Sequence, residues 1–108
     1  MESTPILPLG SVIRLIDGDP SQYVMIIGRG VLTTAEDKDK EHEGYFDYAG
    51  VLIPTGLVDS SQVSFFNREN VKDVIFIGYR DALEQRYEDN YDSFVAASKF
   101  EKLHVPQE

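Results

Sequence analysis

The apolar residues of this chain fall into short runs before Tyr79 and recur at helical spacing only after Asp81. Short runs rich in Val, Ile, Tyr and Phe are typical of β-strands. Apolar residues that recur every three or four positions are typical of one face of an α-helix. Several strands followed by a single helix restrict the chain to an α+β fold.

Five segments have the length and composition of strands, and turn-forming residues separate them. Asp17–Pro20 is predicted to turn the chain, with Gly18 at a positive φ, so that the first two strands form an antiparallel hairpin. Gly28–Gly30 is expected to end the second strand or to form a bulge in it. Pro54–Gly56 is expected to form a later turn. The predicted strands are Ser11–Ile16, Tyr23–Ile27, Tyr45–Leu52, Val63–Asn67 and Val71–Tyr79.

The fifth of these segments gives the strongest strand prediction. Its centre, Val74–Ile77, is continuously apolar, as expected of an interior strand that is covered on both faces. A charge introduced there would be buried without a partner. We therefore expect Ile75→Asp to unfold the domain, at a cost of several kcal/mol.

Two other segments connect the strands. Glu36–Glu43 has no apolar side chain, so we expect an exposed, mobile loop that cannot join a core. Its acidic residues alternate as in a calcium loop, but the required Gly is missing, so a metal site is not predicted. Asp59–Ser61 either caps a single helical turn or begins the fourth strand.

The C-terminal segment has the pattern of one amphipathic helix. Asp81 is the predicted N-cap, and Glu84 is placed to complete a capping box. The helix is expected to run to about Lys102. It could cover the sheet as a lid or offer a surface to a partner, and its single apolar stripe favours the lid. The residues of that stripe are Leu83, Tyr87, Tyr91, Phe94, Val95 and Ser98.

These patterns predict a single α+β domain over residues 8–103. It would contain a five-stranded, mostly antiparallel twisted sheet or partly open barrel, followed by the C-terminal helix. A loose arm, residues 1–7, would precede it, and a tail, residues 104–108, would follow it. A chain of 108 residues can bury one core without disulfides or metals.

Composition narrows the function classes. The net charge of −9 disfavours nucleic acids and anionic membranes as partners and suits a partner with a basic face. The absence of cysteine excludes thiol and Cys-ligated zinc chemistry and favours a reducing compartment. The N-terminal residues do not resemble a signal peptide, and no apolar run approaches a membrane span. We therefore expect a cytoplasmic protein.

No pattern of residues predicts catalysis. His42 and His104 lack neighbours that would orient an imidazole, and we expect both to be solvated. We accordingly predict no enzymatic activity, no cofactor and no metal. Tyr and Arg are enriched at binding hot spots, so Tyr48, Tyr79 and Arg80 are candidates for a partner-binding surface. Arg80 could instead form a structural pair with Asp47 or Glu84.

Several blocks of residues also carry a family resemblance. They are Pro8–Val12, Met25–Gly30, Tyr45–Gly50, Pro54–Gly56, Phe65–Val71 and Val74–Asp81. In order and spacing these blocks resemble a family of short Gram-positive proteins catalogued as a domain of unknown function. The resemblance covers roughly Pro8 to Phe94. Members of that family are typically encoded in type VII secretion loci beside toxins with an LXG N-terminal domain.

The resemblance implies an accessory role in toxin export. The leading hypothesis is a cytoplasmic chaperone or targeting adaptor that holds an LXG toxin before secretion. The alternative is an immunity protein that binds and neutralises the toxin domain. The family provides no catalytic residues to carry over, and the sequence leaves the oligomeric state open.

Overall fold

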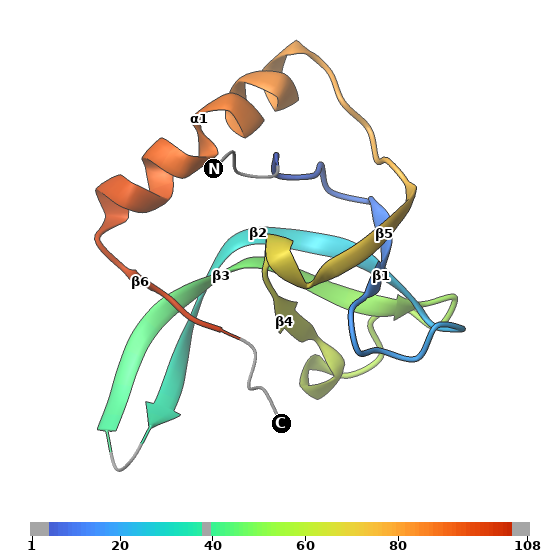
Figure 1. Cartoon of the computed structure of the whole chain (residues 1–108), viewed down its shortest axis with the longest axis horizontal. Coiled ribbons are helices and arrows are strands. Elements are labelled where there is room, and N and C mark those ends of the chain that lie inside the picture. The colour runs from blue at the N-terminus through green and yellow to red at the C-terminus, as the bar shows by residue number, and fades with distance from the viewer. Residues whose placement is uncertain (1–4, 38–39, 105–108) are drawn as a thin grey trace.

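Six strands form one sheet in the computed structural model, which describes residues 5–37 and 40–104. The strand order is β4-β3-β2-β1-β5, and these neighbours are antiparallel. The sixth strand, β6, pairs with β3 in parallel. One helix, α1, crosses a face of the curved sheet (Figure 1). The elements are β1 (Val12–Leu15), β2 (Tyr23–Asp37), β3 (Lys40–Ile53), β4 (Ser64–Phe66), β5 (Val71–Phe76), α1 (Ala82–Ser98) and β6 (Glu101–Lys102).

The predicted α+β class is confirmed: the sheet is mostly antiparallel and not closed, and the helix follows it. Several local predictions are also confirmed. The first two strands are antiparallel, and the register of β2 against β3 shifts between Ile26 and Gly28, as expected of a bulge. Asp59 caps a short 3₁₀ helix, η1 (Ser60–Gln62), by accepting a hydrogen bond from the Ser61 N–H. In the first turn, however, Asp17 has the positive φ in place of Gly18.

The long β2–β3 hairpin corrects the prediction for the charged segment. Glu36–Glu43 is not a loop over its described part, because the ladder pairs Glu36 with Glu41 and Asp37 with Lys40. Residues 38 and 39 lie outside the described residues. Backbone hydrogen bonds hold an antiparallel ribbon together without any apolar side chain. The turn end of the hairpin is therefore a charged ribbon, while its other end contributes Val24, Ile26 and Tyr48 to the core.

The prediction that β5 is an interior strand is wrong. Among residues 5–37 and 40–104 the strand pairs with β1 alone, and it forms one edge of the sheet. Its apolar residues Val74–Phe76 and the following Ile77 are between 45% and 61% exposed. A continuous apolar run specifies burial only if other elements cover it. Here β1 lies on one side of β5, and the chain then leaves the sheet for α1 (Figure 1).

The core lies between the sheet and α1. The N-terminal segment passes between these two layers (Figure 1), and Ile6 is only 1% exposed there. The Leu7 N–H donates a 2.8 Å hydrogen bond to the Tyr48 Oη. The predicted loose arm is therefore wrong for these two residues, while residues 1–4 lie outside the described residues. The buried apolar cluster consists of Ile6, Ile13, Val24, Ile26, Tyr48, Phe66 and Tyr91.

The helix begins as predicted but ends earlier. The Asp81 side chain accepts a hydrogen bond from the Glu84 N–H, which is an N-cap. At the other end Lys99 has φ 64° and closes the helix after Ser98, so the predicted end at about Lys102 is wrong. Pairing with β3 provides the reason. β6 lies so close to Gly44 that a Cβ there would sit 2.6 Å from the Glu101 carbonyl oxygen.

The predicted apolar stripe of α1 is only partly buried. Tyr91 is buried, and Tyr87 and Val95 pack against the core. Leu83 and Phe94 are mostly exposed. The helix is therefore a lid over the sheet along one narrow line, and part of its apolar surface faces solvent.

Ile13 in β1 is buried and Ile75 in β5 is half exposed, so the same substitution should have different effects at these two positions. Ile13→Ala in β1 removes a fully buried side chain and should lower the free energy of unfolding by about 2–5 kcal/mol. Ile75→Ala in β5 removes a half-exposed one and should cost less than about 1 kcal/mol. Urea unfolding followed by circular dichroism measures both. Equal losses would contradict the edge position of β5.

The same reasoning reverses the expectation for Ile75→Asp. A carboxylate at this position can reach water, so the variant should fold cooperatively. Thermal unfolding by calorimetry tests this expectation. A variant that is unfolded at 25 °C would restore the interior placement of the strand.

Candidate functional site

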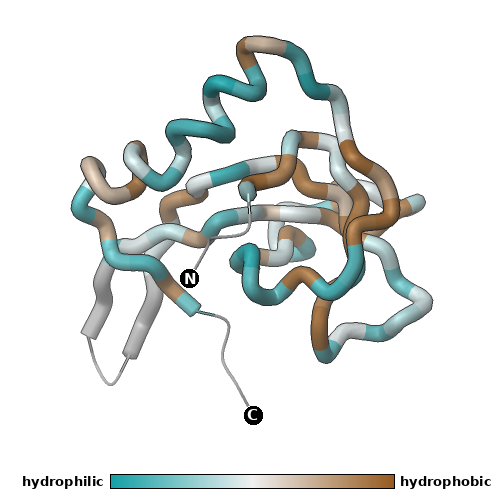
Figure 2. The backbone as a smooth tube through the Cα atoms, turned by 45° about the horizontal axis from the view of Figure 1, so that its top comes forward, coloured by the Kyte–Doolittle hydropathy of each residue, from teal (hydrophilic) through white to brown (hydrophobic). Residues whose placement is uncertain are grey.

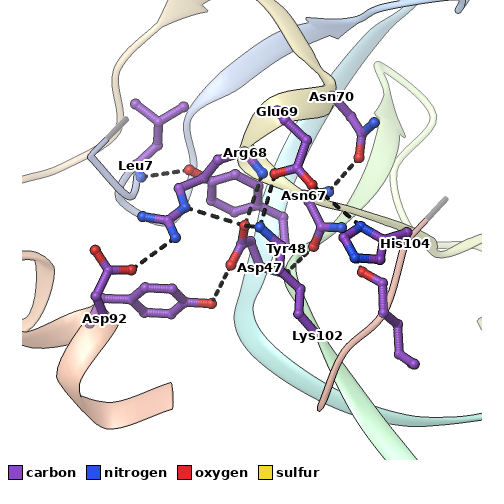
Figure 3. Close-up of polar contacts among 12 residues, drawn as sticks. Leu7, Asp47, Tyr48, Asn67, Arg68, Glu69, Asn70, Asp92, Lys102 and His104 are labelled. Carbon is purple, nitrogen blue, oxygen red and sulfur yellow. Dashed lines mark hydrogen bonds and ion pairs between the residues drawn. The ribbon is translucent and has the colours of Figure 1, made fainter. Parts of the chain in front are cut away.

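A buried carboxylate lies at the centre of the polar interactions of the fold (Figure 3). Asp47, in the middle of β3, is completely buried. The Tyr91 Oη of α1 donates a 2.9 Å hydrogen bond to its Oδ1. The Arg68 N–H and Nε donate to Oδ2 at 3.0 and 3.2 Å. The Lys102 Nζ of β6 lies 3.4 Å from the same oxygen. Asp47 thus joins the sheet to the helix, to the segment before β5 and to the C-terminal strand.

The positive charges of Arg68 and Lys102 help to keep the Asp47 carboxylate ionised. Burial by itself raises the pKa of Asp47, but the Arg68 N–H and the charges of Arg68 and Lys102 outweigh burial and hold this pKa below its usual value. Burial lowers the pKa of Arg68, whereas Asp92 and Asp47 raise it, with a net increase. Burial and the Asp47 carboxylate raise the pKa of Tyr91. At neutral pH the groups therefore act as fixed charges and a fixed phenol donor.

Asn67 extends the same network through amide hydrogen bonds. Its Oδ1 accepts from the Asp47 N–H at 2.9 Å, and its Nδ2 donates to the Leu103 carbonyl at 2.7 Å. A second 3₁₀ helix, η2 (Arg68–Asn70), follows Asn67 directly and leads into β5. The network therefore fixes the point at which β5 begins.

A second polar cluster fixes the point at which the chain leaves β5 for α1. Arg29 in β2 binds Glu84 with both guanidinium nitrogens, one of them at 2.9 Å, and lies 4.2 Å above the Tyr87 ring. Arg80 donates two hydrogen bonds, of 2.9 and 3.0 Å, to Glu88. Burial, together with the neighbouring Glu84, raises the pKa of Glu88 despite Arg80.

Between these two clusters an apolar surface is open to solvent. We call it the β5 strip and define it as Val74, Ile75, Phe76, Ile77 and Tyr79. The first four side chains are about half exposed, and Tyr79 is 78% exposed. Figure 2 shows the hydrophobic segment that rises from the sheet towards the mostly hydrophilic helix. Because contiguous exposed apolar residues are uncommon on a monomer surface, the β5 strip is the candidate functional site.

Gly78 packs the C-terminal part of this strip against the segment that contains Leu9 and Ser11. A Cβ at Gly78 would lie 2.1 Å from the Leu9 carbonyl oxygen, so no larger residue fits. The Gly78 N–H also donates a 3.0 Å hydrogen bond to the Ser11 Oγ. The exposed side chains on either side of Gly78 are therefore displayed from a fixed backbone.

Two shallow hollows flank the helix. One, of about 190 Å³, lies between the C-terminal half of α1 and the β2–β3 hairpin, with Tyr45 and Phe94 in its wall. The other, of about 370 Å³, includes Leu9, Tyr79 and Leu83. Aromatic and aliphatic side chains dominate the lining of the first hollow, which suits the side chains of a protein partner. The second hollow is mixed, because the charged residues Arg29, Asp81 and Glu84 also line it.

The structure separates the three residues predicted to bind a partner. Tyr48 is 1% exposed, so its predicted place on a surface is wrong. Its ring packs against Phe66 in the buried cluster, its Oη accepts from the Leu7 N–H, and burial raises its pKa to about 12. Tyr79 and Arg80 are exposed at the junction, and their binding role stays a prediction. Arg80 pairs with Glu88, not with Asp47 or Glu84 as expected.

The sequence reasoning did not find the Asp47 network. The sequence feature that could have indicated this network is Asp47, a single acidic residue within the aromatic run Tyr45–Leu52. A charge at such a position must be either solvated or paired. The two long-range partners, Arg68 and Tyr91, follow from the fold. Nothing local in the sequence connects them.

Other predicted features of the chain can be placed only in part. His104 is exposed and lies 3.6 Å from Glu69, whereas nothing is described of the His42 side chain. Within residues 5–37 and 40–104 no cluster of three or more acidic or histidine side chains is placed to hold a metal ion. In the same part of the chain no helix is long and apolar enough to cross a membrane.

Comparison with known protein families matches residues 6–87 to the family described as a domain of unknown function (DUF4176). The match covers more than half of the chain, so the protein belongs to this family. The resemblance to a domain of unknown function is thereby confirmed. No curated protein and no solved structure matches the chain.

The Asp47 network predicts a specific pH dependence of stability. Because folding lowers the pKa of Asp47, its contribution is complete above the unfolded value of about 4 and is lost as the pH falls through the folded value. Asp47→Asn should be about 3 kcal/mol less stable than the native protein at pH 7, and this difference should shrink below pH 4. Urea unfolding at pH 7, 5 and 3 measures it.

The matched control is Asp73→Asn, which breaks a partly exposed ion pair with Arg14. It should cost less than about 1 kcal/mol at pH 7. A constant difference between native and Asp47→Asn proteins across this pH range would show that the carboxylate charge contributes nothing.

Tyr91 provides a test of the hydrogen bond between the helix and the sheet. Tyr91→Phe leaves Asp47 Oδ1 without this donor and should cost about 1.5–3 kcal/mol. Tyr79→Phe removes an exposed hydroxyl and should change stability by less than about 0.5 kcal/mol. Equal effects in thermal unfolding would argue against a buried Tyr91–Asp47 bond.

Proposed function

We propose that the protein is a non-enzymatic, protein-binding accessory of type VII secretion. In this proposal it acts in the cytoplasm as a chaperone or targeting adaptor for an LXG toxin. The observation that carries the binding role is the exposed apolar β5 strip. The secretion setting comes from the residue blocks that resemble the family.

The exposed apolar area of this surface suits a chaperone. A protein held for export has apolar segments that must be kept from aggregating. Val74–Ile77 provides apolar area to cover such a segment, and the two polar clusters hold that area rigid at both ends. A preorganised surface loses little conformational entropy when it binds.

The charge of the chain supports the alternative, an immunity protein. With a net charge of −9 the protein would be attracted to a basic toxin domain, and electrostatic steering would speed their association. In this case acidic residues of the surface would make the contact, and the apolar strip would have a smaller part.

Co-purification with separate toxin fragments distinguishes the two roles. An adaptor should capture the N-terminal LXG region of a toxin encoded in the same locus, and an immunity protein should capture its C-terminal domain. Binding through the strip further predicts that Ile75→Lys reduces capture at least about tenfold, because a charge must be desolvated in the contact.

Val58→Lys is the matched control. Val58 is also apolar and 69% exposed, but it lies in the connection that leads to β4, the opposite edge strand. Both variants should melt within a few degrees of the native protein, since both positions are exposed. Capture of neither toxin fragment by the native protein would refute both roles.

A further inference from the structure

The outer edge of β5 carries no strand in the described part of the chain. β5 is the terminal strand of the order β4-β3-β2-β1-β5, and its ladder partner is β1. The backbone N–H and C=O groups on the side away from β1 therefore lack a strand partner among residues 5–37 and 40–104. An edge of this kind is a template for a further strand.

Natural sheets protect such edges with charge, bulges or proline. The register of β5 against β1 shifts in both halves of the strand, whereas charged residues lie in its first half only. Lys72 and Asp73 occupy its first half. The following run, Val74–Ile77, has no charge and no proline. This run is long enough for the several hydrogen bonds of a short added strand.

We propose that the protein binds its partner by strand addition: a short, extended, apolar segment of net positive charge pairs antiparallel with the outer edge of β5. This inference rests on the proposed protein-binding function and names the mode and the chemistry of the partner. Main-chain hydrogen bonds would supply affinity, and the exposed side chains of the β5 strip would select apolar residues in the partner. We choose the antiparallel direction because the pairs within the order β4-β3-β2-β1-β5 are all antiparallel and such pairs predominate in proteins.

Charge and shape select this occupant over a second copy of the chain. Each copy carries a net charge of −9, so two copies repel each other, whereas a basic segment is attracted. The register between β1 and β5 also shifts twice, between Val12 and Ile13 and between Arg14 and Leu15. Such irregularities increase local twist, and two twisted edges pair poorly over a long ladder. A short flexible segment can follow the twist.

The test uses the whole protein and an array of ten-residue peptides in which Val, Ile, Phe, Thr, Lys and Glu are varied at every position. Strand addition predicts that the bound peptides are rich in Val, Ile and Phe and carry Lys. Proline at two central positions of the best peptide should weaken its binding at least about tenfold, because proline cannot donate a ladder hydrogen bond. Replacing its Lys with Glu should weaken binding to a similar extent.

Variants of the protein locate the contact. Ile75→Lys should weaken binding of the best peptide at least about tenfold, whereas Val58→Lys should leave it unchanged. A nitroxide label at the peptide N-terminus should broaden the NMR amide signal of Phe76 more than that of Val71. That order is expected of an antiparallel strand.

Four outcomes overturn the inference, three of them from the peptide experiments. In the first, no peptide of the array binds. In the second, the best peptide still binds after both prolines are introduced. In the third, the Ile75→Lys and Val58→Lys variants bind the best peptide equally well. Formation of a dimer by the native protein that Ile75→Lys abolishes, seen by analytical ultracentrifugation, would also overturn it, because a second copy would then occupy the edge.

Failure of this mode and failure of the proposed function give different results. If an LXG region is captured but the array and the edge variants have no effect, the protein binds through another surface. If β5 binds the peptides but no toxin fragment is captured, strand addition stands and the partner is a different protein.

Discussion

The fold depends on how one buried negative charge is compensated. Asp47 is completely buried, and an isolated carboxylate in that position would be very unfavourable. Three elements distant in sequence each supply a compensating group: Arg68 before β5, Tyr91 on α1 and Lys102 on β6. A well-packed apolar residue could in principle serve stability as well as this network does. What the network adds is direction, since each donor must approach a particular oxygen and so positions its element.

This arrangement explains why the apolar β5 strip is both exposed and rigid. Asn67 and Arg68 fix the chain just before β5, and the Arg29–Glu84 and Arg80–Glu88 pairs fix it after the strand. Tyr91 holds the helix against the sheet through Asp47, and no described strand pairs with the outer edge of β5. The exposure of the strip is therefore a consequence of where the polar groups anchor α1.

Local properties of the chain could be predicted from its sequence, and tertiary ones could not. The strands, the bulge near Gly28 and the Asp81 cap follow from residues that are neighbours along the chain. The place of β5 in the sheet does not, because a run such as Val74–Ile77 is the same in an interior strand and at an uncovered edge. The end of α1 was missed for a similar reason, since pairing of β6 with β3 decides it. For the candidate site, Tyr79 and Tyr48 are chemically identical, and only topology makes one exposed and the other buried.

In the mode of binding that we propose, this DUF4176 protein meets its partner at the outer edge of β5. Amide hydrogen exchange is the measurement that tests this placement, with the protein free and mixed with the LXG region of a toxin encoded in the same locus. Strand addition should slow exchange most strongly over Val71–Ile77, with little change at β4 on the opposite edge. Protection confined to α1 or to β4, with unchanged exchange over Val71–Ile77, would contradict it.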